Sequence, residues 1–140
     1  MNECLIDTDI LSYYMRGLQE IVPRAKKYLG EFGYFNVSSL TVFEILKGLR
    51  KKRLKGKEKV FQKEILKHKV FALDYAIMDR AATLLTALEE KGTPIAHGDL
   101  FIAATALTHD LILVTNNTEH FSKVEGLVLE NWRDYRWDSG

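Results

Sequence analysis

The stretch GDLFIAATALTHDLILVTNN, residues 98–117, decides the fold class. Apolar residues from Ile102 to Leu107 recur at helical spacing in its first part, which predicts an amphipathic helix. Residues 111–114 then form a continuous apolar run, as expected for a strand that is buried on both faces. Polar residues follow this run directly, beginning with Thr115. A helix that leads into a doubly buried strand is typical of α/β proteins with a parallel sheet.

Short apolar runs alternate with helical segments in the rest of the chain as well. We predict strands at about 4–6, 35–37, 70–73 and 127–129, in addition to 111–114. Helices are predicted at about 10–16, 23–29, 40–52, 75–91 and 98–109, with Gly30 ending the second of them. This order predicts βαβ units, and therefore a three-layer α/β/α sandwich with a mainly parallel central sheet.

Length and composition predict a single soluble domain that spans residues 1–140. The only cysteine, Cys4, excludes an intrachain disulfide and a multi-cysteine zinc site, and its apolar surroundings predict a small buried residue. The first residues do not form a signal peptide, and no apolar stretch approaches the ~20 residues that a bilayer span needs. We therefore expect a cytoplasmic protein with no membrane partner.

Charge is distributed unevenly, although the net charge is only +1. Residues 47–69, here called the basic arm, hold eleven Lys and Arg against Glu58 and Glu64, a net charge of +9, so the rest carries −8. Two interpretations stay open: a surface that faces a polyanion beside an acidic site, or a solvated helical face. The arm is predicted to be helical, with its apolar residues facing inward, namely Val60, Phe61, Ile65 and Leu66.

Acidic residues lie where the predicted strands end. Asp7 follows the first strand, and Asp99 begins the helix that leads into strand 111–114. Glu44 lies one turn into the helix after the second strand, among apolar residues. Because ligands of open parallel sheets bind beyond the carboxyl ends of the strands, these three carboxylates are expected to meet at one rim. Carboxylates without His or Cys are the ligand set of a hard cation such as Mg2+ or Mn2+.

Each of these residues also has a purely structural interpretation. Asp7 and Asp99 fit helix caps or first-turn acids, and Glu44 fits a solvent-facing acid on an amphipathic helix. Asp9 and Asp74 are interpreted as a first-turn acid and a helix cap, without a functional role. Asn116 and Asn117 are compatible with a simple turn. The four histidines show no metal-binding spacing and are assigned to the surface or to positions behind the acids, namely His68, His97, His109 and His120.

Four ordered motifs resemble those of PIN-domain ribonucleases, and within them the VapC-type toxins of toxin–antitoxin pairs. The motifs lie at residues 5–11, 38–48, 98–106 and 113–121, and the ending at residues 124–132 is similar too. The third motif places a small residue before Asp99 and an alanine-rich helix after it, and the fourth runs from Leu113 to Phe121. The resemblance covers almost the whole chain.

This resemblance implies a homodimer of α/β/α domains that cleaves RNA with Mg2+ or Mn2+, and a small VapB-like antitoxin as partner. Asp7, Glu44 and Asp99 match the family's acidic residues and would hold the metal. Asn117 joins them as a catalytic candidate, although many members have an acid there and an amide adds no negative charge. The substrate would be transfer RNA or ribosomal RNA. Substrate contacts are expected from Thr115, Arg50, Lys51, Lys52, Arg53 and Lys55.

Three alternatives to this function stay open. A PIN-like module that binds RNA or protein without catalysis would retain the acids but cut nothing. A haloacid-dehalogenase-like phosphohydrolase would use the Asp-x-Asp form of residues 7–9, but the Gly-Thr that usually follows is replaced by Ile10 and Leu11. DNA is a third possibility, as the substrate of the same acidic site.

Overall fold

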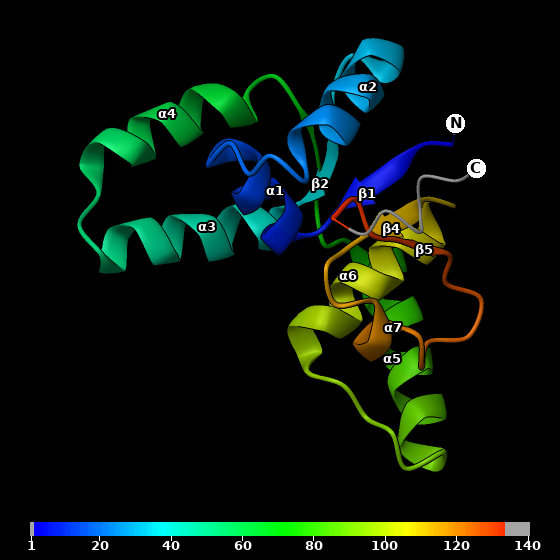
Figure 1. The fold of residues 1–140 in the computed structure, drawn as a ribbon. Helices are drawn as coiled ribbons and strands as arrows, with labels where there is room; N and C mark the ends of the chain where they lie inside the picture. Colours follow the sequence, from blue (N-terminus) through cyan, green and yellow to red (C-terminus); the bar gives the residue numbers. More distant parts are fainter. Residues whose placement is uncertain (1, 134–140) are drawn as a thin grey trace.

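Five short parallel strands form the centre of the fold in the computed structural model, which describes residues 2–133 (Figure 1). They pair in the order β3-β2-β1-β4-β5, so β1 lies in the middle. This confirms the predicted parallel sheet. The strand bounds are β1 (Cys4–Ile6), β2 (Asn36–Ser38), β3 (Lys69–Phe71), β4 (Ile112–Val114) and β5 (Leu129–Glu130).

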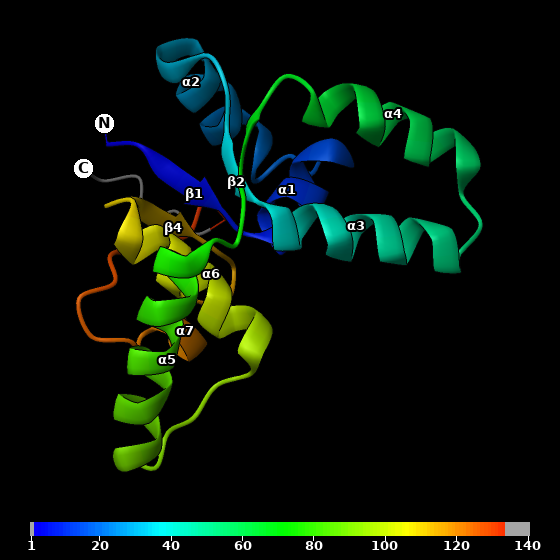
Figure 2. The ribbon, with the colours of Figure 1, turned by 180° about the vertical axis from the view of Figure 1, so that it is seen from behind.

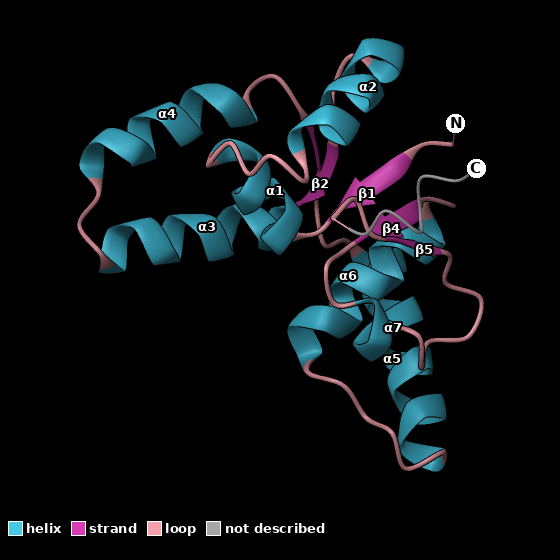
Figure 3. Ribbon diagram, in the orientation of Figure 1, coloured by secondary structure: helices cyan, strands magenta, loops and turns pink. Residues whose placement is uncertain are grey.

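Helices cover both faces of this sheet and complete the predicted three layers (Figure 3). Four of them lie on one side, and the other three lie on the opposite side (Figures 1 and 2). The first group is α1 (Thr8–Met15), α2 (Val22–Phe32), α3 (Ser39–Lys51) and α4 (Lys55–Ile65). The second group is α5 (Tyr75–Glu90), α6 (His97–Thr108) and α7 (Thr118–Phe121).

The central strand β1 contributes to two separate hydrophobic cores. Successive strand residues point to opposite faces, so Leu5 packs with the core that includes α5 and α6, while Cys4 and Ile6 pack with the core of α1 and α2. All three residues are at most 1% exposed. Burial also raises the pKa of the Cys4 thiol to about 12, which agrees with the predicted structural role of this residue.

Helices α3 and α4 form a hairpin that projects sideways from the sheet (Figure 2). Ser38 caps α3 by accepting a hydrogen bond from the Leu40 N–H at 3.1 Å. The prediction that every apolar residue of the basic arm faces inward was wrong for two of them. Phe61 is 1% exposed, but Val60 and Leu66 are 61% and 85% exposed. Only one stripe of α4 faces α1 and α3, so residues on other sides of the helix stay in solvent.

Three predicted boundaries differ from the structure. Helix α2 continues past Gly30 and ends before Gly33, whose φ of 83° fits the left-handed conformation that glycine adopts easily at a helix end. The segment after β4 contains the short helix α7 instead of a simple turn. Strand β5 is Leu129–Glu130, shifted from the predicted 127–129. None of the described helices is long and apolar enough to cross a bilayer.

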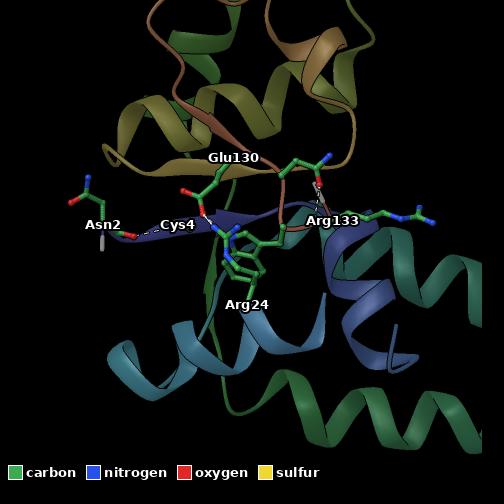
Figure 4. Close-up of polar contacts among 7 residues, drawn as sticks. Asn2, Cys4, Arg24, Glu130 and Arg133 are labelled. Atoms are coloured by element: carbon green, nitrogen blue, oxygen red, sulfur yellow. Dashed lines mark hydrogen bonds and ion pairs between the residues drawn. The ribbon is translucent and has the colours of Figure 1, made fainter. Parts of the chain in front are cut away.

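The carboxyl end of the last strand, β5, contacts α2 through an ion pair (Figure 4). Glu130 Oε1 lies 2.6 Å from an Arg24 guanidinium nitrogen and also accepts a hydrogen bond from the Trp132 indole N–H at 2.8 Å. The Trp132 ring is 4% exposed and packs against Tyr28 and Phe35. These contacts fix the segment that follows β5 beside α1 and α2.

Candidate active site

The carboxyl ends of β1 and β4 lie side by side, because these two strands are paired in register. The chain leaves β1 toward one helical layer and reaches β4 from the other layer, so this is the point where the sheet changes its winding direction. In open α/β sheets such a point forms the functional crevice. Asp7 and Thr115 are the residues that directly follow the two strands, as predicted.

Asp7 is a buried carboxylate that is held on both oxygens. Its Oδ1 accepts from the Thr8 N–H at 2.8 Å, and its Oδ2 accepts from the Thr115 hydroxyl at 2.8 Å. Burial, and then the charge of Asp9 and more weakly that of Asp99, raises the pKa of Asp7 from 3.8 to about 7, although the two hydrogen bonds act in the opposite direction. Burial is therefore the main cause of the raised pKa of Asp7, and the neighbouring acids add to it.

Asp9 lies in the first turn of α1, as predicted, but it is partly buried and contacts the end of β4. Its Oδ2 accepts from the Asn116 N–H at 3.1 Å, so the residue connects the start of α1 with the end of β4. Burial raises the pKa of Asp9, and the charge of Asp99 adds to this rise. One sequence signal could have indicated this contact: Asp9 lies two residues after Asp7, at the start of the same helix.

Asp99 lies in the first turn of α6 and is about one third exposed. His120 of α7 places Nε2 2.9 Å from Asp99 Oδ2, at an angle that is unsuited to a hydrogen bond. This contact agrees with the predicted place of the histidines at the surface or behind the acids. His68 does not fit that prediction: it is buried, and its ring stacks on Phe35 at 4.8 Å.

Glu44 lies on the other side of Thr8 from Asp7. The Thr8 hydroxyl lies 2.7 Å from Glu44 Oε1 and 2.9 Å from the Thr41 hydroxyl, while the Thr8 N–H binds Asp7. Thr8 thus spaces the two carboxylates. The sequence did not indicate this role, because it depends on contacts with residues 33 and 36 positions away.

The acids share a rim without surrounding a common point. Among the described residues, no three Asp, Glu, His or Cys side chains are arranged to enclose a metal ion. Asp7, Asp9 and Asp99 are nevertheless close enough for their charges to raise carboxyl pKa values. Mg2+ keeps several of its waters and binds through one or two carboxylates. The chemistry of the donor set, carboxylates without His or Cys, fits a hard cation at this edge.

Thr115 and Asn117 both follow β4, but their surroundings differ. Thr115 is fully buried, and its hydroxyl donates to Asp7 and accepts from the Asn117 N–H at 3.0 Å. It therefore orients Asp7, and the prediction that it contacts the substrate was wrong, because no part of it reaches the surface. Asn117 starts α7 through its backbone, and its side chain is exposed and forms no hydrogen bond among the described residues.

A cavity of about 750 Å³ opens between α1, α3 and α4, beside the acids. Glu44 and Thr8 lie on its wall together with Lys52 and Lys57 of the basic arm. Arg50 instead forms an ion pair with Glu58 at 3.1 Å. Three further predicted contacts of the arm are exposed but do not line the cavity, namely Lys51, Arg53 and Lys55.

The motif order, the parallel sheet and the acidic rim agree with one family. A family model described as the PIN domain matches residues 4–127. The chain belongs to the PIN domain family. The matched range of this PIN domain contains all four predicted catalytic residues, from Asp7 to Asn117.

Curated relatives of this PIN domain are VapC proteins of similar length. "Ribonuclease VapC2" of Haemophilus influenzae is 32% identical over 135 residues, covering 94% of this chain and 99% of the relative. "tRNA(fMet)-specific endonuclease VapC" of Shigella flexneri is 29% identical over 133 residues, with 94% and 99% covered. The PIN domain is thus of the VapC type, as the resemblance of its motifs implied.

Solved structures of VapBC complexes share the fold. A chain of DNA-bound VapBC from Salmonella typhimurium superposes with a TM-score of 0.80 at 25% identity, over 94% of this chain and 99% of that chain. VapBC2 from Rickettsia felis, bound to a DNA fragment from its promoter, gives 0.77 at 26% identity, with 91% and 97% covered. The likeness extends over nearly the whole PIN domain.

Proposed function

We propose that this PIN domain is a Mg2+- or Mn2+-dependent endoribonuclease and acts as the toxin of a toxin–antitoxin pair. One observation carries the proposal: Asp7, Asp9 and Asp99 are crowded at the carboxyl ends of β1 and β4, with the pKa of Asp7 raised to about 7. Such crowding of negative charge is what a divalent cation relieves. The VapC relatives are named as a ribonuclease and an endonuclease, which supports the same activity.

The side chains of the rim would have different roles in metal binding, positioning and activation of water. Asp7 and Asp99 would hold the cation; the Thr115 hydroxyl fixes the orientation of Asp7 through its hydrogen bond, and His120 lies in ion-pair distance of Asp99. When bound, the cation would offset the negative charge that develops on the phosphodiester in the transition state. Glu44, kept apart from Asp7 by Thr8, would orient the attacking water and accept its proton.

The substrate is RNA in this proposal, and the name of the Shigella flexneri relative supports transfer RNA over ribosomal RNA. Lys52 and Lys57 share a cavity wall with Glu44, so they are the arm residues best placed to attract the RNA backbone. The wider role of the basic arm stays a prediction.

An antitoxin is the proposed protein partner, supported by the VapBC complexes whose chains resemble this one. The cavity beside Glu44 is lined largely by apolar side chains, including Met15, Ile45 and Leu49. A helical segment with apolar anchors would fit it and would cover the acids. We extend the proposal to a cytoplasmic homodimer; light scattering of the purified chain at several concentrations tests the dimer.

Cleavage assays test the proposal directly. Purified protein should cut RNA with Mg2+ or Mn2+ and not with EDTA. The variants Asp7→Asn and Asp99→Asn should each lose about a hundredfold or more, as expected when several kcal/mol of charge stabilisation is removed. Asp79→Asn removes an exposed carboxylate of α5 and serves as the matched control.

Each other outcome has a clear meaning. RNA that is bound but left intact at every Mg2+ concentration would favour the non-catalytic module. Preferential cleavage of DNA would replace the substrate, and full activity in both rim variants would contradict the active site itself.

A further inference from the structure

A second hollow, of about 260 Å³, lies against α1 and is lined by Tyr13, Arg16, Leu18 and Arg133. The guanidinium carbons of Arg16 and Arg133 lie 5.4 and 5.3 Å from the centre of the Tyr13 ring. Both distances are within the range of cation–π contacts. One aromatic ring therefore holds two positive charges at the same hollow.

These two charges are not neutralised by any residue that the structure describes. Arg24 pairs with Glu130 and Arg50 pairs with Glu58, but neither Arg16 nor Arg133 forms an ion pair within residues 2–133. Two guanidinium groups near one ring repel each other, and an anion between them would remove that repulsion. The ring fixes both groups in advance, so less side-chain entropy is lost when an anion binds.

The hollow lies directly beside the acidic rim. On α1, Tyr13 and Arg16 follow Asp9 by four and seven residues, so they share its face of the helix at roughly 6 and 10 Å along the axis. Arg16 also lines the larger cavity that contains Glu44. An RNA strand that extends from the acids along this face of α1 would therefore contact the two arginines.

Arg133 is tied to the same rim from the other side. The backbone N–H of Arg133 donates to Asn131 Oδ1 at 2.9 Å, and Asn131 Nδ2 donates to Asn116 Oδ1 at 3.4 Å. The backbone N–H of Asn116 in turn donates to Asp9 Oδ2. Figure 4 shows the Arg133 side chain running toward α1, away from the Glu130–Arg24 pair. The segment after β5 thus brings one of the two charges to the acids.

We infer that Tyr13, Arg16 and Arg133 form a subsite for the phosphates of single-stranded RNA next to the scissile bond. The inference rests on the proposed function and names where the substrate backbone binds. A nuclease rim made of carboxylates repels the phosphates that it must approach, so cations are needed beside it. Arginine suits phosphate because its planar fork donates two parallel hydrogen bonds. Tyr13 positions the arginines and is not itself a catalytic residue.

Binding measurements in EDTA test this subsite without cleavage. The probe is a 5′-labelled single-stranded RNA oligonucleotide of mixed sequence, titrated at several salt concentrations. Each lost phosphate contact should reduce the magnitude of the slope of log affinity against log salt by about 0.7. At 0.1 M salt this corresponds to a roughly fivefold weaker affinity. The double variant Arg16→Gln/Arg133→Gln should thus bind about 25-fold more weakly. Arg80→Gln, an exposed arginine of α5, is the matched control and should change neither quantity.

Substitution of the ring separates positioning from charge. Tyr13→Phe keeps the ring and should bind RNA normally, whereas Tyr13→Leu should weaken binding although both arginines remain. Thermal unfolding of every variant confirms the fold.

An unchanged affinity and slope in the folded double variant would overturn the subsite. Loss of affinity for a peptide of the antitoxin, with RNA binding intact, would also overturn it and assign the hollow to a protein partner. Reduced RNA binding in a chain that proves unable to cleave would support the subsite while contradicting the proposed nuclease function.

Discussion

Asp7 is a single residue of the site whose charged form lowers the stability of the fold. Its pKa is about 7 in the folded chain, against 3.8 for an exposed aspartate. Between these values the unfolded chain releases the proton and the folded chain keeps it, so the unfolded state is favoured as the pH rises from about 4 to 7. In metal-free buffer the free energy of unfolding should therefore fall over this range.

Asp7→Asn should remove this loss. In EDTA at pH 8 we expect the variant to be more stable than the parent chain by a few kcal/mol, with little difference near pH 4. Urea unfolding at both pH values measures this, and Asp79→Asn provides the exposed control. A parent chain that is as stable as the variant at pH 8 would show that the Asp7 carboxylate is not under strain.

His120 should act on the metal through Asp99. Because its Nε2 lies 2.9 Å from Asp99 Oδ2, His120→Ala should weaken Mn2+ binding by roughly 10–100-fold, as for other residues that orient a ligand. His120→Gln keeps a nitrogen at a similar reach and should restore part of this affinity. Electron paramagnetic resonance of free Mn2+ gives the affinity, and equal losses in both variants would indicate that the histidine only fills space.

The candidate acids and the place of Thr115 at the rim could be predicted from the sequence, whereas the specific contacts that hold the acids could not. Asp7 and Asp99 were predicted because strand and helix ends have local signals. Thr115, His120 and Thr8 act through contacts between segments that are far apart in the chain, such as Thr115 to Asp7 over 108 positions. No local pattern encodes such contacts. The contact between Asp9 and the Asn116 N–H was not predicted, because the first-turn position of Asp9 already had a sufficient explanation.

At the scale of the elements, periodicity predicted which segments are helices and strands better than where they end. Gly30 did not end α2, because glycine is tolerated inside a helix and the left-handed end is supplied by Gly33. Helix α7 has only four residues and therefore almost no periodic signal. The bounds of β5 differ from the prediction because its position is set by pairing with β4, which is a contact between distant segments.

Helix α4 permits a sharp test of the stripe that it buries. Phe61 is 1% exposed and Leu66 is 85% exposed, although the sequence predicted that both face inward. Phe61→Ala should cost about 3–5 kcal/mol of stability, since it leaves a cavity, while Leu66→Ala should change stability by less than about 0.5 kcal/mol. Urea denaturation compares the two. Similar losses would mean that α4 packs on a different face.

At the scale of the whole molecule, the strand order creates the site. Because β1 lies in the middle of the sheet and pairs with β4, residues 7 and 115 become neighbours. The two helical layers then bring Glu44 from one side and Asp99 from the other. The segment after β5, fixed by Glu130 to α2, adds Arg133 to the same edge. The sheet thus brings acids and a cation from four segments, together with Thr115 from a fifth, to one edge.

A crystal of the protein soaked in Mn2+ measures the central claim most directly, by anomalous scattering at the manganese edge. We predict one strong peak at the carboxyl ends of β1 and β4, about 2.0–2.4 Å from oxygens of both Asp7 and Asp99. In Asp99→Asn this peak should be absent. Saturating Mn2+ with no peak at this edge, or with the ion bound only elsewhere, would show that Asp7 and Asp99 do not hold the metal.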